Sequence, residues 1–411
     1  MRRSVVDFAV DFAVAPAPRR DPTTVTFTPV AFAGAVGTFV LIGVTSSLFG
    51  PLLGTFAHHF AVSLATAGTA LSLYYVGGVA GVGAGWLGVA RLPGATVVSG
   101  ALLTMSIGAI GVALARGWTV FAVALVVLGL GFGALATAIN SLLARTMEDG
   151  RARRLSVVNA GFGVGAVAGP LLSIGVHVHH FATIFIGVAV LGAVLAASTR
   201  GLHAPAHHAE HSRHGVRPAG RTRILVTFVV AYVLYEALES SASGWMATHL
   251  HRTGYSVTVS AVINAGFWAA LAAARFAGGP AHRRWREGPL VLASLIGAAV
   301  CAAGALAHDL APVAYPLLGV ALASVFPMGV VWYARLSPRD SDGVSMVMLF
   351  AMLGGVIGPG GVDVAVAHLG VRVVPVALTV LAILDLAVFA SLARVPRRRV
   401  ARASSTATDA A

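Results

Sequence analysis

Residues 118–144 read WTVFAVALVVLGLGFGALATAINSLLA, an apolar run that contains no charged side chain. A helix needs about 20 such residues to cross the hydrocarbon core of a bilayer, which is about 30 Å thick. A membrane β-strand would instead alternate apolar and polar residues over about 10 positions, and this run does not alternate. The stretch therefore predicts a transmembrane helix.

Comparable runs, bounded by Gly, Pro, Arg and His, recur from residue 28 to near the C-terminus. Of the 411 residues, 57% are hydrophobic and only 10% are charged, and the mean hydropathy is +0.85. Soluble proteins average about a quarter charged residues, so the soluble globular classes are excluded. The sole cysteine, Cys301, excludes a disulfide scaffold. We expect twelve transmembrane helices, at residues 28–56, 64–88, 94–115, 118–144, 154–177, 181–199, 224–248, 257–280, 289–307, 312–334, 343–367 and 372–393.

The cationic side chains predict how these helices are oriented. All 28 of them are arginines, and the formal net charge is +13. With the N-terminus inside the cell, every arginine except Arg116, Arg252 and Arg372 falls on the cytosolic side. Cytosolic loops are enriched in Lys and Arg, so we expect a multi-pass protein of the inner (plasma) membrane with both termini in the cytosol. The same distribution explains the positive charge without nucleic-acid binding.

The chain also repeats itself. GAVAGP at residues 165–170 corresponds to GGVIGP at residues 354–359, and Arg145 and Arg335 end the fourth and tenth expected helices. Small residues four positions apart also promote close helix packing, but the matching offsets favour duplication of a six-helix unit. The shared residues are Gly165, Gly169 and Pro170 in one half and Gly354, Gly358 and Pro359 in the other.

This duplication predicts an all-α integral membrane protein with two six-helix halves. We expect the N-terminal bundle at residues 28–199 and the C-terminal bundle at residues 224–394. A polar linker rich in His and Arg, residues 200–223, joins them in the cytosol. Residues 1–27 and 395–411 are expected to be cytosolic tails.

Acidic side chains are scarce and unevenly distributed. None lies between Asp21 and Glu148, so the first four expected helices contain no carboxylate. A charge at the centre of a membrane helix costs about 2.5–3.5 kcal/mol on insertion scales, so every acid within a span requires an explanation. The acids within the expected spans are Glu236, Glu239, Asp363 and Asp385.

Glu236 and Glu239 are three positions apart and therefore share one face of their helix. Two carboxylates held close together in a low dielectric cannot both ionise cheaply, so one of them should keep its proton near neutral pH. This property suits a proton-coupling site, and a structural pairing with Arg275 is the alternative. For Asp385 a peripheral structural role is equally compatible with the sequence, and Asp363 is left without a role.

Amide and aromatic side chains accompany the acidic pair. A neutral polyol such as a sugar would be held by amide and carboxylate hydrogen bonds, with a ring face stacked on an aromatic side chain. We therefore take Asn140, Trp245 and Trp268, together with Glu239, as candidate substrate-binding residues. Asparagines also hold membrane helices together, and Trp and Tyr gather at membrane interfaces. The interface is the preferred explanation for Tyr74, Tyr75, Trp332 and Tyr333.

The other chemical signals are weak. Residues 203–214 contain five histidines, but no cysteine or spaced carboxylate completes a metal site there, so a solvated linker is favoured. The chain shows no nucleotide-binding Gly-rich loop, metal-ligand cluster or nucleophile–base spacing. We expect no cofactor, no bound metal and no enzymatic activity, and an ATP-driven pump is disfavoured.

Several motifs together point to a known family. The seventh expected helix reads YEALESSASGW at residues 235–245, and the eighth reads FWAALAAAR at residues 267–275. The tenth carries Phe-Pro at residues 326–327. The fifth reads FGVGAVAGP at residues 162–170, a segment that contains the repeated motif GAVAGP. With Asn140 of the fourth helix, these motifs resemble the major facilitator superfamily, and more narrowly its fucose permease and sugar transporter branch.

Three features depart from the expected pattern, one from that of the superfamily and two from that of the branch. The loop at residues 85–94 keeps its glycines and Arg91 but lacks the usual acid. Ala136 stands where an acidic residue often precedes Asn140, and Asn159 stands where a histidine often opens the fifth helix. The resemblance implies gating or structural roles for Arg91, Arg275 and the repeated Gly-Pro motifs. Because of these departures, it does not carry a coupling carboxylate over to the first half.

We therefore predict a monomeric secondary transporter that moves a small polar organic solute, such as a sugar, by alternating access coupled to protons. Glu239 is the expected principal coupling residue, with Glu236 tuning it and Arg275 as a gating partner. The absence of acidic residues from the first four expected helices favours an alternative, a proton antiporter that exports drug-like amphiphiles. A transporter-like membrane sensor that moves nothing is a further alternative.

Overall fold

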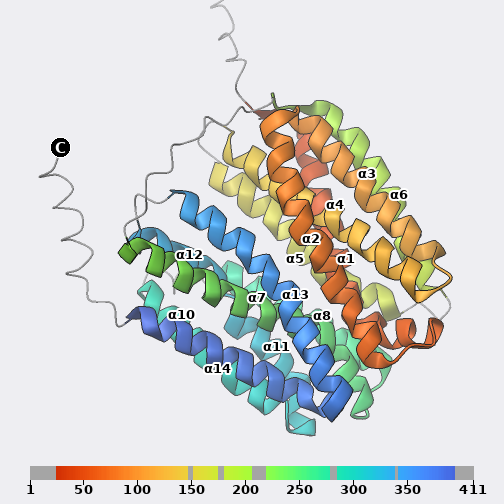
Figure 1. Ribbon diagram of the computed structural model, residues 1–411, viewed down its shortest axis with the longest axis vertical. Coiled ribbons are helices and arrows are strands. Elements are labelled where there is room, and N and C mark those ends of the chain that lie inside the picture. The colour runs from red at the N-terminus through yellow and green to blue at the C-terminus, as the bar shows by residue number, and fades with distance from the viewer. Residues whose placement is uncertain are drawn as a thin grey trace, which may run out of the picture.

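Among the residues that the computed structural model describes, twelve helical spans are long and apolar enough to cross a membrane. The described residues are 25–146, 151–174, 180–205, 219–277, 285–337 and 341–393. The expected number of spans is confirmed. Figure 1 shows the first half, coloured red to yellow-green, beside the second half, coloured green to blue.

The first half consists of six helices: α1 (Pro29–His59), α2 (Leu64–Arg91), α3 (Gly94–Leu114), α4 (Trp118–Ala144), α5 (Arg151–Ile174) and α6 (Phe181–Ser198). The second half consists of α7 (Ala219–Arg252), α8 (Val257–Ala277), α10 (Glu287–Gly304), α11 (Ala311–Leu322), α12 (Val325–Leu336), α13 (Ser341–Leu369) and α14 (Val374–Ala393). Short 3-10 helices cover Thr199–Gly201, His308–Leu310 and Val371–Val373.

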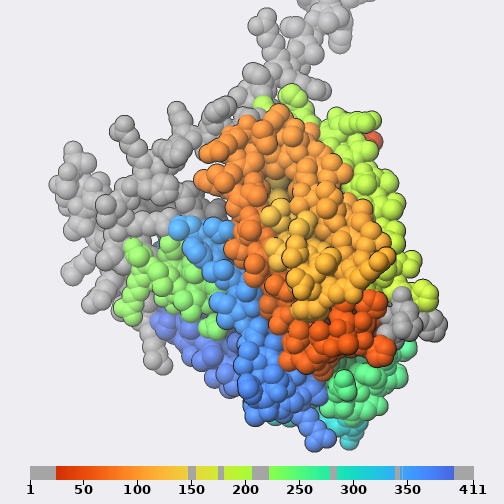
Figure 2. All heavy atoms as spheres, turned by 45° about the vertical axis from the view of Figure 1, so that its right-hand side comes forward, coloured from red at the N-terminus to blue at the C-terminus, as the bar shows by residue number. Residues whose placement is uncertain are grey.

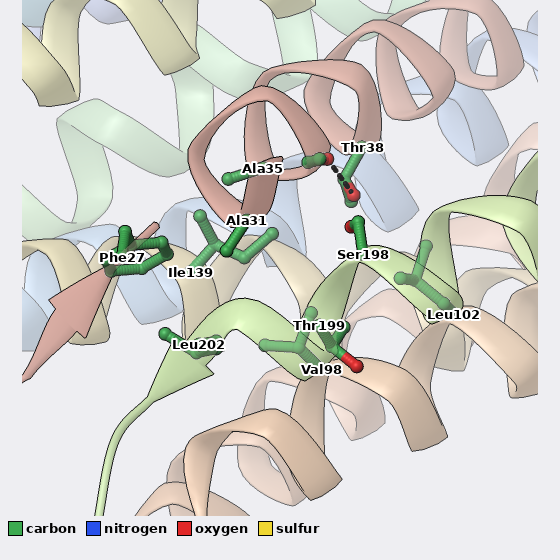
Figure 3. A pocket seen from close by; sticks show the side chains of 11 residues that line it. Phe27, Ala31, Ala35, Thr38, Val98, Leu102, Ile139, Ser198, Thr199 and Leu202 are labelled. Carbon is green, nitrogen blue, oxygen red and sulfur yellow. Dashed lines mark hydrogen bonds between the residues drawn. The ribbon is translucent and has the colours of Figure 1, made fainter. Parts of the chain in front are cut away.

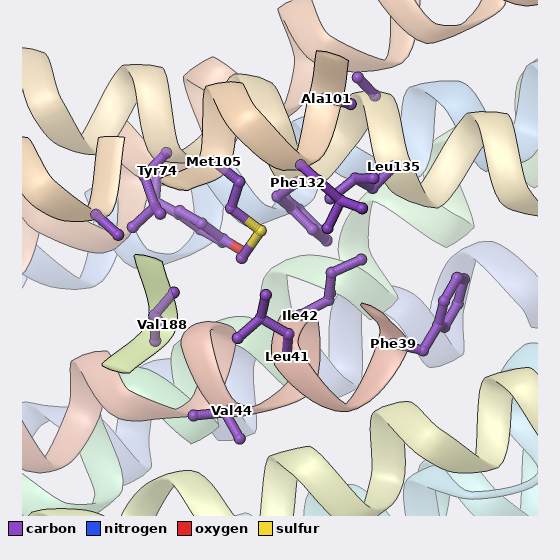
Figure 4. Packing of buried hydrophobic residues seen from close by; sticks show 14 of the residues in the cluster. Phe39, Leu41, Ile42, Val44, Tyr74, Ala101, Met105, Phe132, Leu135 and Val188 are labelled. Carbon is purple, nitrogen blue, oxygen red and sulfur yellow. The ribbon is translucent and has the colours of Figure 1, made fainter. Parts of the chain in front are cut away.

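Each half has a hydrophobic core of its own. In the first half, Leu41 and Ile42 of α1 pack with Met105 of α3 and with Phe132 and Leu135 of α4 (Figure 4). The core of the second half draws on α7, α8 and α10 to α14, and Leu53 of α1 and Ala166 of α5 join it from the first half. Two bundles, each with most of its core within itself, are the arrangement that the sequence repeat predicts.

The repeated glycines explain how the helices cross within each half. Gly165 of α5 lies against the backbone of α1, where a Cβ atom would overlap the Val40 carbonyl. Gly354 of α13 lies in the same way against the Val233 carbonyl of α7. The pairs α1–α5 and α7–α13 are therefore equivalent crossings in the two halves, and small residues allow both of them.

Most helix ends differ from the expected spans by a few residues, and two differences affect the architecture. The span expected at 312–334 is interrupted between α11 and α12, because Pro327 lacks an N–H and its ring would clash with the Ala323 carbonyl of a continuous helix. Helix α7 begins at Ala219, so part of the expected linker is helical.

The first residues of the linker are anchored to the first half. Strand β2 (Leu202–His203) pairs antiparallel with β1 (Thr26–Phe27), which directly precedes α1. The Arg145 guanidinium at the end of α4 donates to the Pro205 carbonyl at 3.4 Å. Most of the histidine-rich stretch lies in residues 206–218, outside the described residues.

We call the end of the molecule at which α2, α4 and α12 terminate, near Arg91, Arg145 and Arg335, the Arg-rich end. The two halves meet through α1 and α7, α2 and α13, and α5 and α8. Figure 2 shows α13, in blue, directly against the orange surface of α2. In Figure 1, α2 and α13 lie side by side away from the Arg-rich end and diverge toward it.

Polar contacts across this seam lie toward the end opposite the Arg-rich end. Ser72 Oγ of α2 donates to the Val356 carbonyl of α13 at 3.2 Å. Thr248 Oγ1 of α7 donates to the Gly50 carbonyl of α1 at 3.4 Å. The structure therefore holds the two halves together at the end opposite the Arg-rich end.

The crossing of α1 and α5 generates a stability prediction. We expect Gly165→Ala to lower the unfolding temperature of the detergent-solubilised protein, because the added methyl group overpacks the crossing at a cost of about 1–3 kcal/mol. Gly187→Ala on α6 is the matched control, since a Cβ atom there would meet nothing within 4 Å. Equal unfolding temperatures for the two variants would contradict this account of the crossing.

Candidate functional site

The acidic face of α7 lies inside the membrane-spanning part of the second half. Glu239 is buried, with 9% of its surface exposed, and Glu236 is half-buried one turn earlier. The hydroxyl of Tyr235, four positions before Glu239, donates a hydrogen bond to the Glu239 carboxylate. Helical spacing thus supplies one partner for this acid from its own helix.

Helix α8 supplies the second partner. Arg275 Nη2 lies 3.6 Å from Glu239 Oε2 and donates to the Tyr235 hydroxyl oxygen at 3.1 Å. The three side chains form a closed cluster in which the buried carboxylate has both a cationic neighbour and a hydroxyl donor. A buried ion pair is stable only when such additional hydrogen bonds satisfy it.

The charges on this face of α7 do not balance once Glu236, three positions before Glu239, is included. Glu236 and Glu239 provide two carboxylates, and Arg275 provides one guanidinium. An extra negative charge within a membrane is costly, so a proton or a cationic group of a ligand would be bound favourably here. Proton coupling at this face stays a prediction.

A second acidic contact lies at the seam between the halves. Trp245 Nε1 of α7 donates to Asp363 Oδ1 of α13 at 2.9 Å, and Asp363 is only 3% exposed. Gly68 of α2 packs against both side chains, and a Cβ atom there would overlap them. Asp363, to which the sequence analysis gave no role, thus pairs with Trp245 at the interface between the two halves.

The candidate substrate-binding residues are not gathered into one cluster. Trp245 is almost completely buried, and its N–H is taken by Asp363. Trp268 of α8 donates to Ser243 Oγ at 3.2 Å, and its ring forms a T-shaped contact with Phe162 of α5 at a centroid distance of 5.7 Å. Trp268 therefore lies where the two halves meet, on the helix that also carries Arg275.

Asn140 lies in the first half, at the interface of α4 and α5. Its amide donates to the Ala136 carbonyl at 2.9 Å, and the Asn159 amide donates to Asn140 Oδ1 at 3.4 Å. Asn159 is exposed and Asn140 is half-buried, so the pair remains accessible. Arg91, the second arginine with an expected gating role besides Arg275, is the exposed last residue of α2.

One expectation about aromatic side chains is wrong. The sequence placed Tyr74, Tyr75, Trp332 and Tyr333 at the membrane interface, but all four are buried. Trp332 and Tyr333 pack edge-on against Phe228 of α7. Tyr74 and Tyr75 lie on the side of α2 that faces the interior. In a helix that is apolar all round, the spacing of apolar residues does not tell the interior side from the lipid-facing side.

The cavity drawn in Figure 3 is separate from this cluster. It lies between α1, α3 and the 3-10 turn after α6, with Thr38 and Ser198 among the lining residues, and Thr38 Oγ1 donates to the Gly34 carbonyl at 2.8 Å. Its volume of about 10 Å³ suits about one water molecule. It is too small for an organic solute.

Comparison with known proteins establishes the family. Residues 35–315 match the Major Facilitator Superfamily, and the chain belongs to this family of membrane transporters. The match confirms the resemblance to the superfamily and the fold class, and it points to a transporter rather than an enzyme. A sequence search of curated proteins finds no match.

Solved structures share the fold. The chain is similar to a D-xylose–proton symporter, with 10% identity, a TM-score of 0.75 and coverage of 89% of this chain and 97% of that one. It is also similar to a bacterial homolog of the human lysosomal transporter Spinster in an inward-facing, unoccupied conformation (15% identity, TM-score 0.71, coverage 89% and 97%). The transporter FucP in an outward conformation is a third (17% identity, TM-score 0.62, coverage 87% and 97%). Because a nucleoside transporter shares the fold as well, the sugar branch stays a prediction.

The two remaining acids of the membrane spans generate a prediction. Asp385 of α14 is completely buried, and neither of its oxygens has a hydrogen-bond partner among the described residues. We expect Asp385→Val to leave the unfolding temperature unchanged or raise it. The matched variant Asp363→Val should lower it, because a buried Trp245 N–H without an acceptor costs about 1–3 kcal/mol.

Thermal unfolding of the two purified variants checks this contrast. A loss of stability in Asp385→Val as large as that in Asp363→Val would show that Asp385 makes a stabilising contact.

Proposed function

We propose that this chain is a secondary transporter that carries a small polar organic solute, such as a sugar, across the plasma membrane in exchange with or together with protons. The observation that supports it most directly is the buried Glu239, which is joined to Tyr235 of its own helix α7 and to Arg275 of the neighbouring helix α8. A buried acid with a cationic partner and a neighbouring carboxylate can change its protonation when the surroundings change.

In this proposal the protein works by alternating access. The two bundles rock about a central site, as parallel repeats of this kind allow. With the Arg-rich end in the cytosol, the seam of α2 and α13 closes the outward side in the conformation described above. When the halves separate on that side, the buried Trp245–Asp363 pair of the second half would become exposed to the outside.

The proposed roles follow from these positions. Glu239 binds the coupling proton and contacts the solute, and Glu236 modifies the charge of the same face. Asn140 on the first half and Trp268 on the second would hold the solute between the halves, and Trp245 would join them in the outward-open state. Arg275 would act as the gating partner of Glu239, since it contacts both Glu239 and Tyr235.

One observation favours a second candidate, a proton-coupled exporter of amphiphilic molecules. The first four helices contain no acidic side chain, and Phe162 of the first half lies at the interface with the second. An apolar wall facing an acidic one suits a molecule with an apolar body and a cationic group. Uptake and efflux assays with labelled sugars and with cationic dyes separate the two candidates.

Glu239→Gln provides the decisive variant for coupling. An uncharged amide mimics the protonated acid permanently, so we expect solute exchange to continue while uphill transport driven by a pH gradient is lost. Both can be measured in proteoliposomes as counterflow and as accumulation of the same labelled solute.

Glu287→Gln serves as a control, because Glu287 pairs with Arg335 at 2.7 Å at the Arg-rich end of the same half. It should keep pH-driven accumulation. Accumulation by Glu239→Gln at the wild-type rate would place proton coupling elsewhere, whereas equal loss of exchange and accumulation would indicate a structural role.

A further inference from the structure

A polar contact joins α7 and α8 one helical turn beyond the acidic cluster. The amide nitrogen of Asn264 on α8 donates to the Ser243 carbonyl of α7 at 2.9 Å. One turn further along α8, Trp268 Nε1 donates to the hydroxyl oxygen of the same serine at 3.2 Å. Ser243 thus holds two side chains of the neighbouring helix through two different oxygen atoms.

Helical spacing places this contact in line with the acidic cluster. Ser243 lies four positions after Glu239 on α7, and Trp268 lies seven positions before Arg275 on α8. Residues at these spacings share one face of a helix. Because a helix rises 1.5 Å per residue, Ser243 lies about 6 Å along α7 from Glu239, away from the Arg-rich end. The interface of α7 and α8 therefore carries polar pairs at successive levels.

The first half of the protein covers this contact. A Cβ atom at Gly50 of α1 would overlap the Ser243 carbonyl and would lie 3.2 Å from the Asn264 amide nitrogen. The ring of Trp268 packs against Phe162 of α5. Asn264 and Trp268 therefore lie beneath the first half, and separation of the two halves would uncover them.

Asn264 has one hydrogen-bonding atom that the protein does not use. The residue is completely buried, and its Oδ1 atom has no hydrogen-bond partner among the described residues. The orientation of the amide is fixed, because the Ser243 carbonyl can only accept and must therefore face the NH2 group. Buried polar atoms are normally paired, so this oxygen is a free acceptor for a donor from outside the protein.

We propose that Asn264 is a further solute-binding residue, and that its carboxamide oxygen accepts a hydrogen bond from a hydroxyl group of a neutral, hydroxylated solute. The proposal deepens the proposed function and rests on it. Ser243 is the positioning residue, since its carbonyl orients the amide and its hydroxyl holds Trp268. An uncharged acceptor beside an indole ring suits a sugar-like molecule, whereas the cationic group of an amphiphile would bind more strongly to a carboxylate.

The position of Asn264 also determines when it meets the solute. The contact lies on the side of the acidic cluster away from the Arg-rich end, and α1 covers it in the conformation described here. With the Arg-rich end in the cytosol, opening of the outward side would expose the Asn264 oxygen. Asn264 therefore contributes to binding of solute from the outside.

Counterflow in right-side-out membrane vesicles tests this proposal. The probes are a panel of labelled neutral monosaccharides and the monodeoxy analogues of the sugar that exchanges best. For the unchanged protein, removal of the hydroxyl that Asn264 contacts should raise the half-saturating external concentration about three- to tenfold, as expected for one neutral hydrogen bond. Asn264→Ala should raise it by a similar factor for the parent sugar and should leave that one analogue unaffected.

Thr248→Val is the matched control. It removes a hydrogen bond of 3.4 Å to the Gly50 carbonyl at the same crossing but no proposed solute contact, so it should affect all the sugars by one common factor. Asn264→Ser replaces Asn264→Ala if the latter does not fold, because it also lacks the carboxamide oxygen while its hydroxyl can bond to a helix carbonyl.

An Asn264 variant that weakens the parent sugar and every deoxy analogue equally would overturn the proposal, because it would show a structural role. A variant that discriminates among the sugars as the unchanged protein does would overturn it as well. In both cases the unchanged protein still exchanges sugar, so the proposed function stands. Absence of exchange for every sugar in the unchanged protein would contradict the sugar-carrier function, and the role of Asn264 would fall with it.

Discussion

The cost of placing a carboxylate inside a membrane organises the second half of this protein. Glu239 is tolerated because Tyr235 one turn away and Arg275 on the next helix both contact it. The same constraint explains the Trp245–Asp363 contact, since the indole N–H satisfies one oxygen of a nearly buried acid. These contacts tie α7 to α8 and α13, the helices that also meet the first half.

Glycine at the crossings lets these helices come close enough for such contacts. Gly354 brings α13 against α7 in the second half, as Gly165 brings α5 against α1 in the first. Gly68 and Gly355 act between the halves, where they make room for the Trp245–Asp363 pair and for the Tyr75 ring. Packing of small residues and pairing of buried acids are therefore parts of the same interface.

Much of the fold could be predicted from the sequence, because membrane helices carry a strong local signal. The twelve spans, the two halves and the glycine crossings follow from run length and the repeat at residues 165–170 and 354–359. The break between α11 and α12 could have been anticipated from Pro327. Which side of an apolar helix faces the interior is not a local property, so Tyr75 was placed at the membrane interface although it is buried.

The site was predictable only in part, for a similar reason. Scarcity of acids pointed to Glu236 and Glu239, and the approach of Arg275 to Glu239 agrees with the alternative of a paired site. The partnership of Trp245 with Asp363 joins residues that are far apart in the chain, and only the packing of α7 against α13 reveals it.

Our central claim is that solute movement is coupled to protons through the acids of the second half. The most direct measurement is counterflow of a panel of labelled sugars and other small polar solutes in proteoliposomes, followed by accumulation of any exchanged solute under an imposed pH gradient. The account predicts that at least one solute exchanges and is moved uphill by the gradient. Exchange that is indifferent to the pH gradient would contradict it.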